Sequence, residues 1–209
     1  MPSYWWCDPS SGTKYADVGT VADAQTYYDN MAGDYEAVVR GWGYNCPEVV
    51  ADKVAELVDP TARVLDLGCG DGLVGEALKV RGFNNISGYD ISEKMVELAL
   101  SKKVYKVTKQ ADLNQPLALP PASFDVITCV GVTTYIQPRV LTDWIRIIKT
   151  GGYCVFTVKS GVLEKWKATQ DAVEARGEWK SVYISKPLYY LPGLRDPKEE
   201  RVFVYVYRK

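Results

Sequence analysis

The sequence contains no histidine among its 209 residues. Histidine is the side chain that most often acts as a general base near neutral pH, so any reaction must use another proton acceptor or none. The five cysteines are widely spaced and never arranged as CxxC: Cys7, Cys46, Cys69, Cys129 and Cys154. This pattern argues against a disulfide framework and gives no metal site, and it fits a reducing compartment.

Long apolar runs and strong net charge are also missing. The longest uncharged run, 126–138, is well short of the roughly 20 residues of a membrane span, and the start of the chain lacks the pattern of a signal peptide. The net charge is -1, and the only loose basic cluster is SKKVYKVTK (101–109), typical of a solvated face. These features predict a soluble, cytoplasmic protein without a membrane or nucleic-acid partner.

The length and a hydrophobic content of 47% predict one domain spanning 1–209. From about residue 60, short apolar runs alternate with amphipathic stretches. Strands are expected at 63–68, 85–90, 104–112, 124–131 and 153–159. Helices are expected at 72–82, at 92–102 with Ser92 as N-cap, and at 140–152, the last closed by glycine. Strict alternation predicts an α/β fold with a doubly wound, mostly parallel, Rossmann-like sheet over 59–209.

The two ends of the chain depart from this alternation. Two strand-like runs, 178–186 and 200–208, predict an antiparallel C-terminal hairpin, which brings the sheet to seven strands. Residues 20–58 read as two or three helices that have no strand between them. They are expected to form an N-terminal helical cap, within 1–58, over the carboxyl edge of the sheet, where such folds bind ligands. The aromatic start, Tyr4 to Trp6, is expected to pack against the sheet.

The most informative stretch is VLDLGCGDG (64–72), a strand followed by a glycine-rich turn and a helix. Such a turn lets the backbone approach a ligand closely, and a dinucleotide is the first candidate. Leu73, however, occupies the position where the dinucleotide fingerprint needs a small residue. Asp66 and Asp71 would also face a pyrophosphate, and two unit charges about 5 Å apart repel by roughly 3 kcal/mol at a dielectric constant of about 20. A cationic ligand such as S-adenosylmethionine (SAM) is favoured instead.

The sequence resembles the class I SAM-dependent methyltransferases from Tyr28 to its end. VLDLGCGDG matches their first motif, GYD (88–90) their ribose-binding acid, and ADLNQPLALPPASFDVIT (111–128) their third and fourth segments. YDNMAGDYEAV (28–38) resembles a Y-D-x-x-A-x-x-Y segment of small-molecule members. The stretch 28–57 most resembles the methyltransferase-like proteins of the Williams-Beuren critical region group.

This resemblance implies a role for each matching position. Asp66 would help to hold the methionine ammonium, indirectly or directly. Asp90 would grip the ribose, Ile91 would pack on adenine, and Tyr28 and Tyr35 would lie over the cofactor. The implied cofactor set is completed by residues along the methionine, adenine and sulfonium: Arg40, Gly68, Cys69, Gly70, Met95, Asp112, Leu113, Cys129, Val130 and Gly131. Cys69 and Cys129 are expected to be small buried fillers, because no histidine exists to activate them.

Methyl transfer from SAM is an in-line displacement that needs alignment more than a base. Without histidine, the acceptor atom is expected to be sulfur, nitrogen or a carboxylate oxygen, with Tyr28, Tyr35, Thr133 and Tyr135 as candidate catalytic residues. Tyrosines and tryptophans would suit a cationic acceptor, whereas Lys159 and Arg40 would hold a carboxylate, and both interpretations stay open.

The modest size of the cap favours a small-molecule acceptor. The alternatives are a protein or peptide methyltransferase and a non-catalytic SAM-binding partner subunit. The sequence carries no signal for an oligomeric state.

Overall fold

The computed structural model describes residues 6–7, 14–15, 21–193 and 201–209. Tyr4 and Trp5 lie outside this range, as does the side chain of Trp6, and with them the expected packing of the aromatic start. Short strands β1 (Trp6–Cys7) and β2 (Lys14–Tyr15) pair with each other, apart from the main sheet.

The main sheet has eight strands, and seven of them form a continuous path in the order β5-β4-β3-β6-β7-β10-β8. The parallel strands are β3 (Val64–Leu67), β4 (Ile86–Asp90), β5 (Val107–Gln110), β6 (Phe124–Cys129) and β7 (Ile148–Lys159). The chain winds outward from β3 in one direction and from β6 in the other. The boundary between the paired strands β3 and β6 is therefore the topological switch point, and open α/β sheets bind ligands at the carboxyl ends of the strands there.

The expected antiparallel C-terminal pair is confirmed. Strand β10 (Arg201–Arg208) runs antiparallel to β7 on one side and to β8 (Lys180–Ile184) on the other. A two-residue strand that the sequence did not predict, β9 (Leu188–Tyr189), also pairs with β10. The later strand of the hairpin thus lies inside the sheet, and the earlier strand forms its edge.

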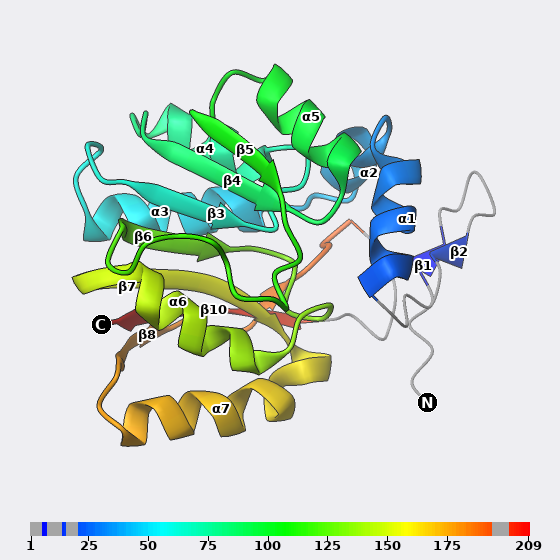
Figure 1. Ribbon diagram of the computed structural model, residues 1–209. Helices are drawn as coiled ribbons and strands as arrows, with labels where there is room; N and C mark the ends of the chain where they lie inside the picture. The colour runs from blue at the N-terminus through cyan, green and yellow to red at the C-terminus, as the bar shows by residue number, and fades with distance from the viewer. Residues whose placement is uncertain (1–5, 8–13, 16–20, 194–200) are drawn as a thin grey trace.

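Helices cover both faces of the sheet (Figure 1). Helices α3 (Cys46–Leu57), α4 (Leu73–Val80) and α5 (Glu93–Ser101) lie on one face, and α6 (Leu141–Ile147) and α7 (Leu163–Ala175) on the other. Neighbouring residues of a strand serve opposite faces: Val64 packs in the α3/α4 core and Leu65 in the α6/α7 core. Burial on both faces explains why the parallel strands read as continuous apolar runs.

Three helices occupy the expected cap region. Helices α1 (Val21–Met31) and α2 (Tyr35–Gly41) lie by the carboxyl ends of the strands, where α1 packs against α5. Ser92 caps α5 as predicted, accepting from the Met95 amide at 3.1 Å, and its hydroxyl also donates to Asp29 of α1. Helix α3 instead packs beside α4 on a face of the sheet, so among the described helices of this region α1 and α2 are the ones that lie at the carboxyl edge.

The helix predicted over 140–152 is wrong in its second half. A 3-10 turn, η1 (Pro138–Val140), leads into α6, which ends at Ile147, and 148–152 already belong to β7. Ile148 pairs with Phe124 of β6. A side chain at Gly152 would meet the Asp125 carbonyl oxygen at 2.6 Å, so this glycine allows close strand contact and does not cap a helix.

One strand and one helix also differ from the expectation. Strand β5 is shorter than the predicted 104–112, and α7, preceded by the 3-10 turn η2 (Ser160–Val162), was not predicted. The buried residues of α7 are Trp166, Gln170 and Val173, a stripe with too few apolar positions to stand out in the sequence. Its anchor is Trp166, whose indole N–H donates to the Thr133 carbonyl at 3.0 Å.

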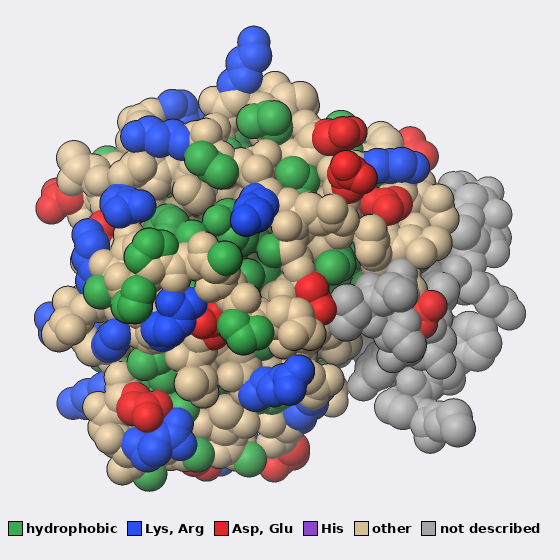
Figure 2. Space-filling view, viewed as in Figure 1, with side chains coloured by type: hydrophobic (Ala, Val, Ile, Leu, Met, Phe, Trp, Pro, Cys, Tyr) green, Lys and Arg blue, Asp and Glu red, His purple; other side chains and the backbone are tan. Residues whose placement is uncertain are grey.

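The surface seen in Figure 2 carries interspersed basic and acidic side chains. Within the described residues, no helix combines the length and the apolar content that crossing a membrane requires.

The glycine-rich turn rests on the side chain of Tyr105. Gly72, at φ 103°, precedes α4 without a side-chain cap. Instead, the Tyr105 hydroxyl accepts from the Gly75 amide at 3.0 Å and donates to Asp66 at 2.8 Å. A Cβ atom at Gly75 would lie 2.4 Å from the Tyr105 ring, and one at Gly88 would lie 2.8 Å from it. Glycine at both positions therefore lets this phenol fit beneath the turn.

We expect Gly75→Ala to destabilise the protein by about 2 kcal/mol, because the Tyr105 ring must move and its buried hydrogen bonds weaken. That loss outweighs the helix propensity gained, about 1 kcal/mol. The melting temperature should fall by about 4–8 °C. Gly33→Ala is the matched control, because nothing lies within 4 Å of its added Cβ. Equal melting temperatures for the two variants would contradict this role of Tyr105.

Candidate functional site

A pocket of about 650 Å³, counting its open mouth, lies at the carboxyl ends of β3, β4 and β6, under α1 and α2. Many residues predicted from the sequence line it: Tyr28, Tyr35, Gly68, Gly70, Asp90, Ile91, Met95, Asp112, Leu113, Val130, Gly131 and Tyr135. Segments far apart in sequence therefore meet at the switch point of the sheet. The volume is typical of small-molecule and cofactor sites.

The turn after β3 presents bare backbone to this pocket. Gly68 and Gly70 have φ values of 72° and 51°, which side chains rarely adopt. A Cβ atom at Gly68 would lie 2.2 Å from Val132, whereas one at Gly70 would meet no atom within 4 Å. The amides of Gly68 and Cys69 both donate to the Tyr89 carbonyl, which fixes the turn against β4.

Asp90 ends β4 and is the best-fixed carboxylate of the lining. One oxygen accepts from the Gly70 amide at 2.8 Å and the other from the Ser92 amide at 2.9 Å. The residue is 8% exposed, and burial raises the pKa of its carboxyl group. Each oxygen keeps further lone pairs for a ligand, so Asp90 can accept from two neighbouring hydroxyl groups.

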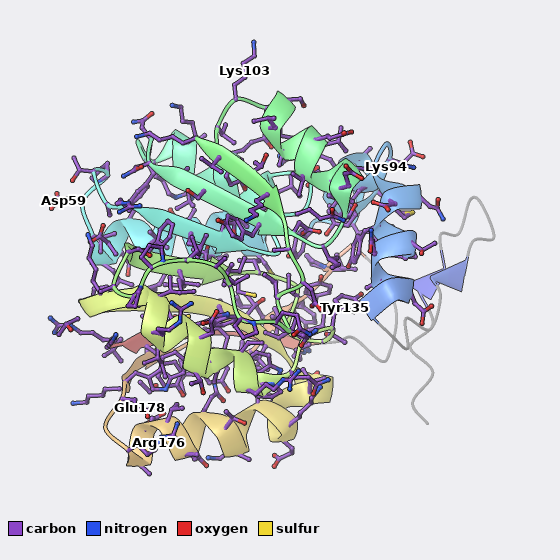
Figure 3. The ribbon with its side chains drawn as sticks, in the orientation of Figure 1. Asp59, Lys94, Lys103, Tyr135, Arg176 and Glu178 are labelled. Atoms are coloured by element: carbon purple, nitrogen blue, oxygen red, sulfur yellow. The ribbon has the colours of Figure 1, made fainter. Side chains whose placement is uncertain are left out.

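Three tyrosines cover the other end of the pocket. The ring centroid of Tyr28 lies 5.9 Å from that of Tyr35 and 5.8 Å from that of Tyr135, each pair meeting edge to face. Tyr135 reaches toward α1 from the loop after β6 (Figure 3). Burial raises the pKa of Tyr28 and Tyr35 above the usual tyrosine value. Both therefore remain phenols at neutral pH, able to donate hydrogen bonds but unable to act as bases.

Five predicted residues lie outside the lining: Arg40, Asp66, Cys69, Cys129 and Thr133. Cys69 and Cys129 are buried, and burial raises the pKa of both thiols, which fits their expected role as fillers. The Thr133 hydroxyl donates to the Thr157 carbonyl at 2.8 Å within the core.

Asp66 faces inward, away from the pocket. It is fully buried and accepts hydrogen bonds from Tyr105 at 2.8 Å and Thr128 at 2.9 Å. Burial raises its pKa to about 7. In this structure its carboxylate supports the turn from below.

Asp71 also has a partner within the protein, the side chain of Lys102. The Lys102 ammonium lies 3.3 Å from Asp71, and 2.9 Å from both Glu36 of α2 and Glu76 of α4. The sequence argument places the carboxylates of Asp66 and Asp71 near the ligand, whereas neither residue belongs to the pocket lining and each has a partner within the protein. Asp90 and Asp112 are the acidic residues that line the pocket.

Arg40 belongs to the same charge network on the outside of the cap. Its guanidinium lies 2.7 Å from Glu36, 3.6 Å from Glu76 and 3.8 Å from Glu48, and half of the side chain is exposed. The network ties α2 to α3 and α4, at a distance from the pocket lining.

Four lining residues were not predicted: Ala24, Asn114, Val132 and Ile136. Ala24 lies one helical turn before Tyr28, so the periodicity of α1 was a signal for it. The others directly follow predicted site residues in loops, where the sequence gives no rule for which side chain turns inward.

Comparisons with known proteins agree with this geometry. Residues 65–156 match the family model of a methyltransferase domain. The chain is 31% identical over 166 residues to human methyltransferase-like protein 27, a match that covers 75% of this chain and 68% of that protein. The chain belongs to the SAM-dependent methyltransferase family. The resemblance seen in the sequence is thus confirmed, and the cofactor is SAM.

Other relatives match a shorter part of this methyltransferase. The ubiquinone biosynthesis O-methyltransferase of Dechloromonas aromatica is 35% identical over 96 residues, covering 43% of this chain and 41% of that enzyme. The chain thus spans about two fifths of the length of that relative.

Solved structures share the fold at low sequence identity. The cyclase SpnF aligns with a TM-score of 0.69 at 15% identity, covering 91% of this chain and 96% of the other. A SAM-dependent methyltransferase of Thermotoga maritima, described as a possible histamine N-methyltransferase, aligns with a TM-score of 0.63 at 18% identity, covering 88% and 98%.

The residues of the pocket fit SAM. The open space beside Gly70 leaves room for a ligand against the backbone. Asp90 lies at the end of β4, and its carboxylate oxygens can accept hydrogen bonds from a ribose. The apolar side chains of Ile91, Met95 and Leu113 offer a surface for an adenine ring.

Asp66 should make stability depend on pH. Its carboxyl pKa is about 7 in the folded protein, against about 3.9 in an unfolded chain. Between these values the folded state holds a proton that the unfolded state has released, so stability from Asp66 is present at low pH and lost as pH rises to about 7. We expect urea unfolding of Asp66→Asn to show a smaller loss of stability from about pH 5 to pH 7 than the wild type. Parallel pH profiles would contradict the raised pKa.

Lys102→Met should weaken cofactor binding, because Glu36, Asp71 and Glu76 lose their shared ammonium and α2 loses its tie to the glycine-rich turn. We expect a SAM dissociation constant about fivefold higher, with less dependence on salt than in the wild type. Lys103→Met is the control, since this neighbouring side chain points away from the molecule (Figure 3). Titration calorimetry at low and high salt measures both effects, and identical affinities for the two variants would refute this role of Lys102.

Proposed function

We propose that this methyltransferase transfers the methyl group of SAM to a small-molecule acceptor, at a sulfur, nitrogen or carboxylate oxygen atom, by in-line displacement. The observation that carries the proposal is the pocket itself. It combines a fixed carboxylate, Asp90, with a tyrosine-lined end, and α1 and α2 cover it. Such a covered pocket suits a cofactor and a compact acceptor, because closure excludes water and aligns the reacting atoms.

When bound, SAM supplies a methyl group on a positively charged sulfur, which becomes a neutral thioether as the methyl group leaves. Asp90 would accept from the ribose hydroxyls, with its orientation fixed by the amides of Gly70 and Ser92. Ile91, Met95 and Leu113 would hold the adenine ring, and Asp112 its polar edge. Val130 and Gly131, which follow β6 and line the pocket, would border the sulfonium.

The tyrosines would bind and orient the acceptor. Because Tyr28 and Tyr35 stay protonated, they would donate hydrogen bonds to it and would not remove its proton. Thr133, held by the Thr157 carbonyl, would support the loop that carries Tyr135. An acceptor that arrives without a proton on the attacking atom fits this set best, as expected from a chain without histidine.

The names of one sequence relative and one structural neighbour refer to small-molecule acceptors, which supports this proposal. One is an O-methyltransferase of ubiquinone biosynthesis, and a structural neighbour is described as a possible histamine N-methyltransferase.

Asp90→Ala should raise the SAM dissociation constant at least about 30-fold, because two ribose hydrogen bonds to a charged group are lost. Titration calorimetry measures this. Asp59→Ala is the matched control, because Asp59 lies on the opposite side of the molecule from Tyr135 (Figure 3). Unchanged SAM affinity in Asp90→Ala would refute the assigned site.

Incubating the protein with labelled SAM and a metabolite extract tests the acceptor class. We expect label in low-molecular-weight products, and none when Asp90→Ala replaces the wild type. Label found only in proteins or peptides would refute the proposed acceptor class.

A further inference from the structure

A side-chain hydrogen bond joins two loops of the pocket lining. The side-chain carbonyl of Asn114, in the loop after β5, accepts from the backbone amide of Gln137, in the loop after β6, at 2.8 Å. Asn114 itself lines the pocket. Gln137 directly follows two further lining residues, Tyr135 and Ile136. Strands β4 and β3 lie between β5 and β6 in the sheet, so this bond links loops whose strands are not neighbours.

Asn114 belongs to a tight turn in the part of the pocket assigned to the adenine ring. Its backbone amide donates to the Asp112 carboxylate at 2.9 Å, and the Gln115 amide donates to the Asp112 carbonyl at 3.0 Å. Asp112 and Leu113 are the lining residues proposed to meet the adenine. A cofactor that contacts these two residues therefore also fixes the backbone that carries the Asn114 side chain.

The loop after β6 is attached to the rest of the protein at both of its ends. At its start, the Gly131 amide donates to the Thr157 hydroxyl of β7 at 2.8 Å. At its far end, the Gln137 amide is held by Asn114. Tyr135, the tyrosine of the acceptor end, lies between these two attachments. The second attachment therefore restricts where the Tyr135 backbone can lie.

The bond between Asn114 and Gln137 is within reach of water, because Gln137 is exposed and Asn114 is only partly buried. The Arg139 guanidinium, which donates to the Asn114 backbone carbonyl at 3.3 Å, adds one longer contact between the same two segments. A neutral hydrogen bond in reach of water contributes an amount of the order of the thermal energy. A ligand that fixes one partner of such a bond can therefore shift the balance between the bonded and the open end of the loop.

We propose that Asn114 is a positioning residue that couples the two parts of the reaction site. Cofactor binding at Asp112 and Leu113 fixes Asn114, and Asn114 holds Gln137 and with it the loop that presents Tyr135 to the acceptor. This inference rests on the proposed function and adds an order to it, because the cofactor organises the acceptor end before the acceptor binds. By linkage, an acceptor that fixes Tyr135 would tighten cofactor binding through the same bond.

Amide-resolved hydrogen exchange by NMR, with and without S-adenosylhomocysteine, tests the coupling on the full chain. The reporters are the amides of Gln137 and of Tyr135, the latter bonded to the Val132 carbonyl at 2.8 Å. In the wild type we expect the ligand to slow both amides about fivefold, the ratio that one neutral hydrogen bond sets. In Asn114→Ala the ligand should still bind, with its affinity changed by less than that factor, but the slowing should disappear. Asn114→Asp should restore the slowing, because a carboxylate oxygen accepts the same bond.

Two controls separate coupling from a general loss of stability. Gln115→Ala changes the exposed neighbour of Asn114 and should behave as the wild type. The Gly131 amide, bonded to Thr157, should exchange at the wild-type rate in Asn114→Ala. A variant that merely loosened the whole structure would speed this amide as well.

If Asn114→Ala does not fold, Gln137→Pro removes the same bond from the donor side. The φ angle of Gln137 is -92°, near the range of proline, and the Tyr135 amide remains as the reporter. Slowing that persists in the variant without this bond, a wild type whose amides do not respond to the ligand, or an Asn114→Asp that behaves as Asn114→Ala would overturn the inference. Failure of S-adenosylhomocysteine to bind the wild type would instead refute the proposed function.

Discussion

The carboxylate of Asp66 accepts hydrogen bonds from Tyr105 and Thr128 in a region closed to solvent, directly beneath the glycine-rich turn. The Tyr105 hydroxyl in turn accepts a hydrogen bond from the Gly75 amide, one of the N–H groups at the start of α4 that have no partner within the helix. The side chain of Tyr105 thus joins the glycine-rich turn to strand β3 and to helix α4. The position of the Gly70 amide, which donates to Asp90 of the pocket lining, depends on this buried arrangement.

Polar contacts at the rim help to hold the cap helices α1 and α2 to the core, beside the apolar packing of Val39 of α2. Ser92, the N-cap of α5, bonds to Asp29 of α1, and Lys102 bridges Glu36 of α2 to the turn and to α4. Such contacts are weaker and more dependent on salt than core packing. Raising the ionic strength should therefore weaken this part of the attachment of α1 and α2.

The sequence pointed to the right cofactor for a reason that the structure corrects in part. The sequence argument places Asp66 and Asp71 beside the ligand as charges, yet one faces Tyr105 and the other Lys102. The motif and the position of Asp90 carried the correct conclusion. A carboxylate next to a glycine turn in sequence has several directions to face, and only its three-dimensional neighbours select one.

By itself, the sequence determined most of the alternation of strands and helices, the antiparallel end, the glycine-rich turn and the place of Asp90 at the end of a strand, because local periodicity and spacing encode them. It also indicated Tyr28, Tyr35 and Tyr135, since they stand in recognisable segments. The tertiary structure alone decided which of these groups face the pocket, that Arg40 and Lys102 serve the outside of the cap, and that Asn114 meets Gln137. Those two residues lie in loops after strands that are not neighbours, and no local pattern can encode a meeting that depends on the order of strands in the sheet.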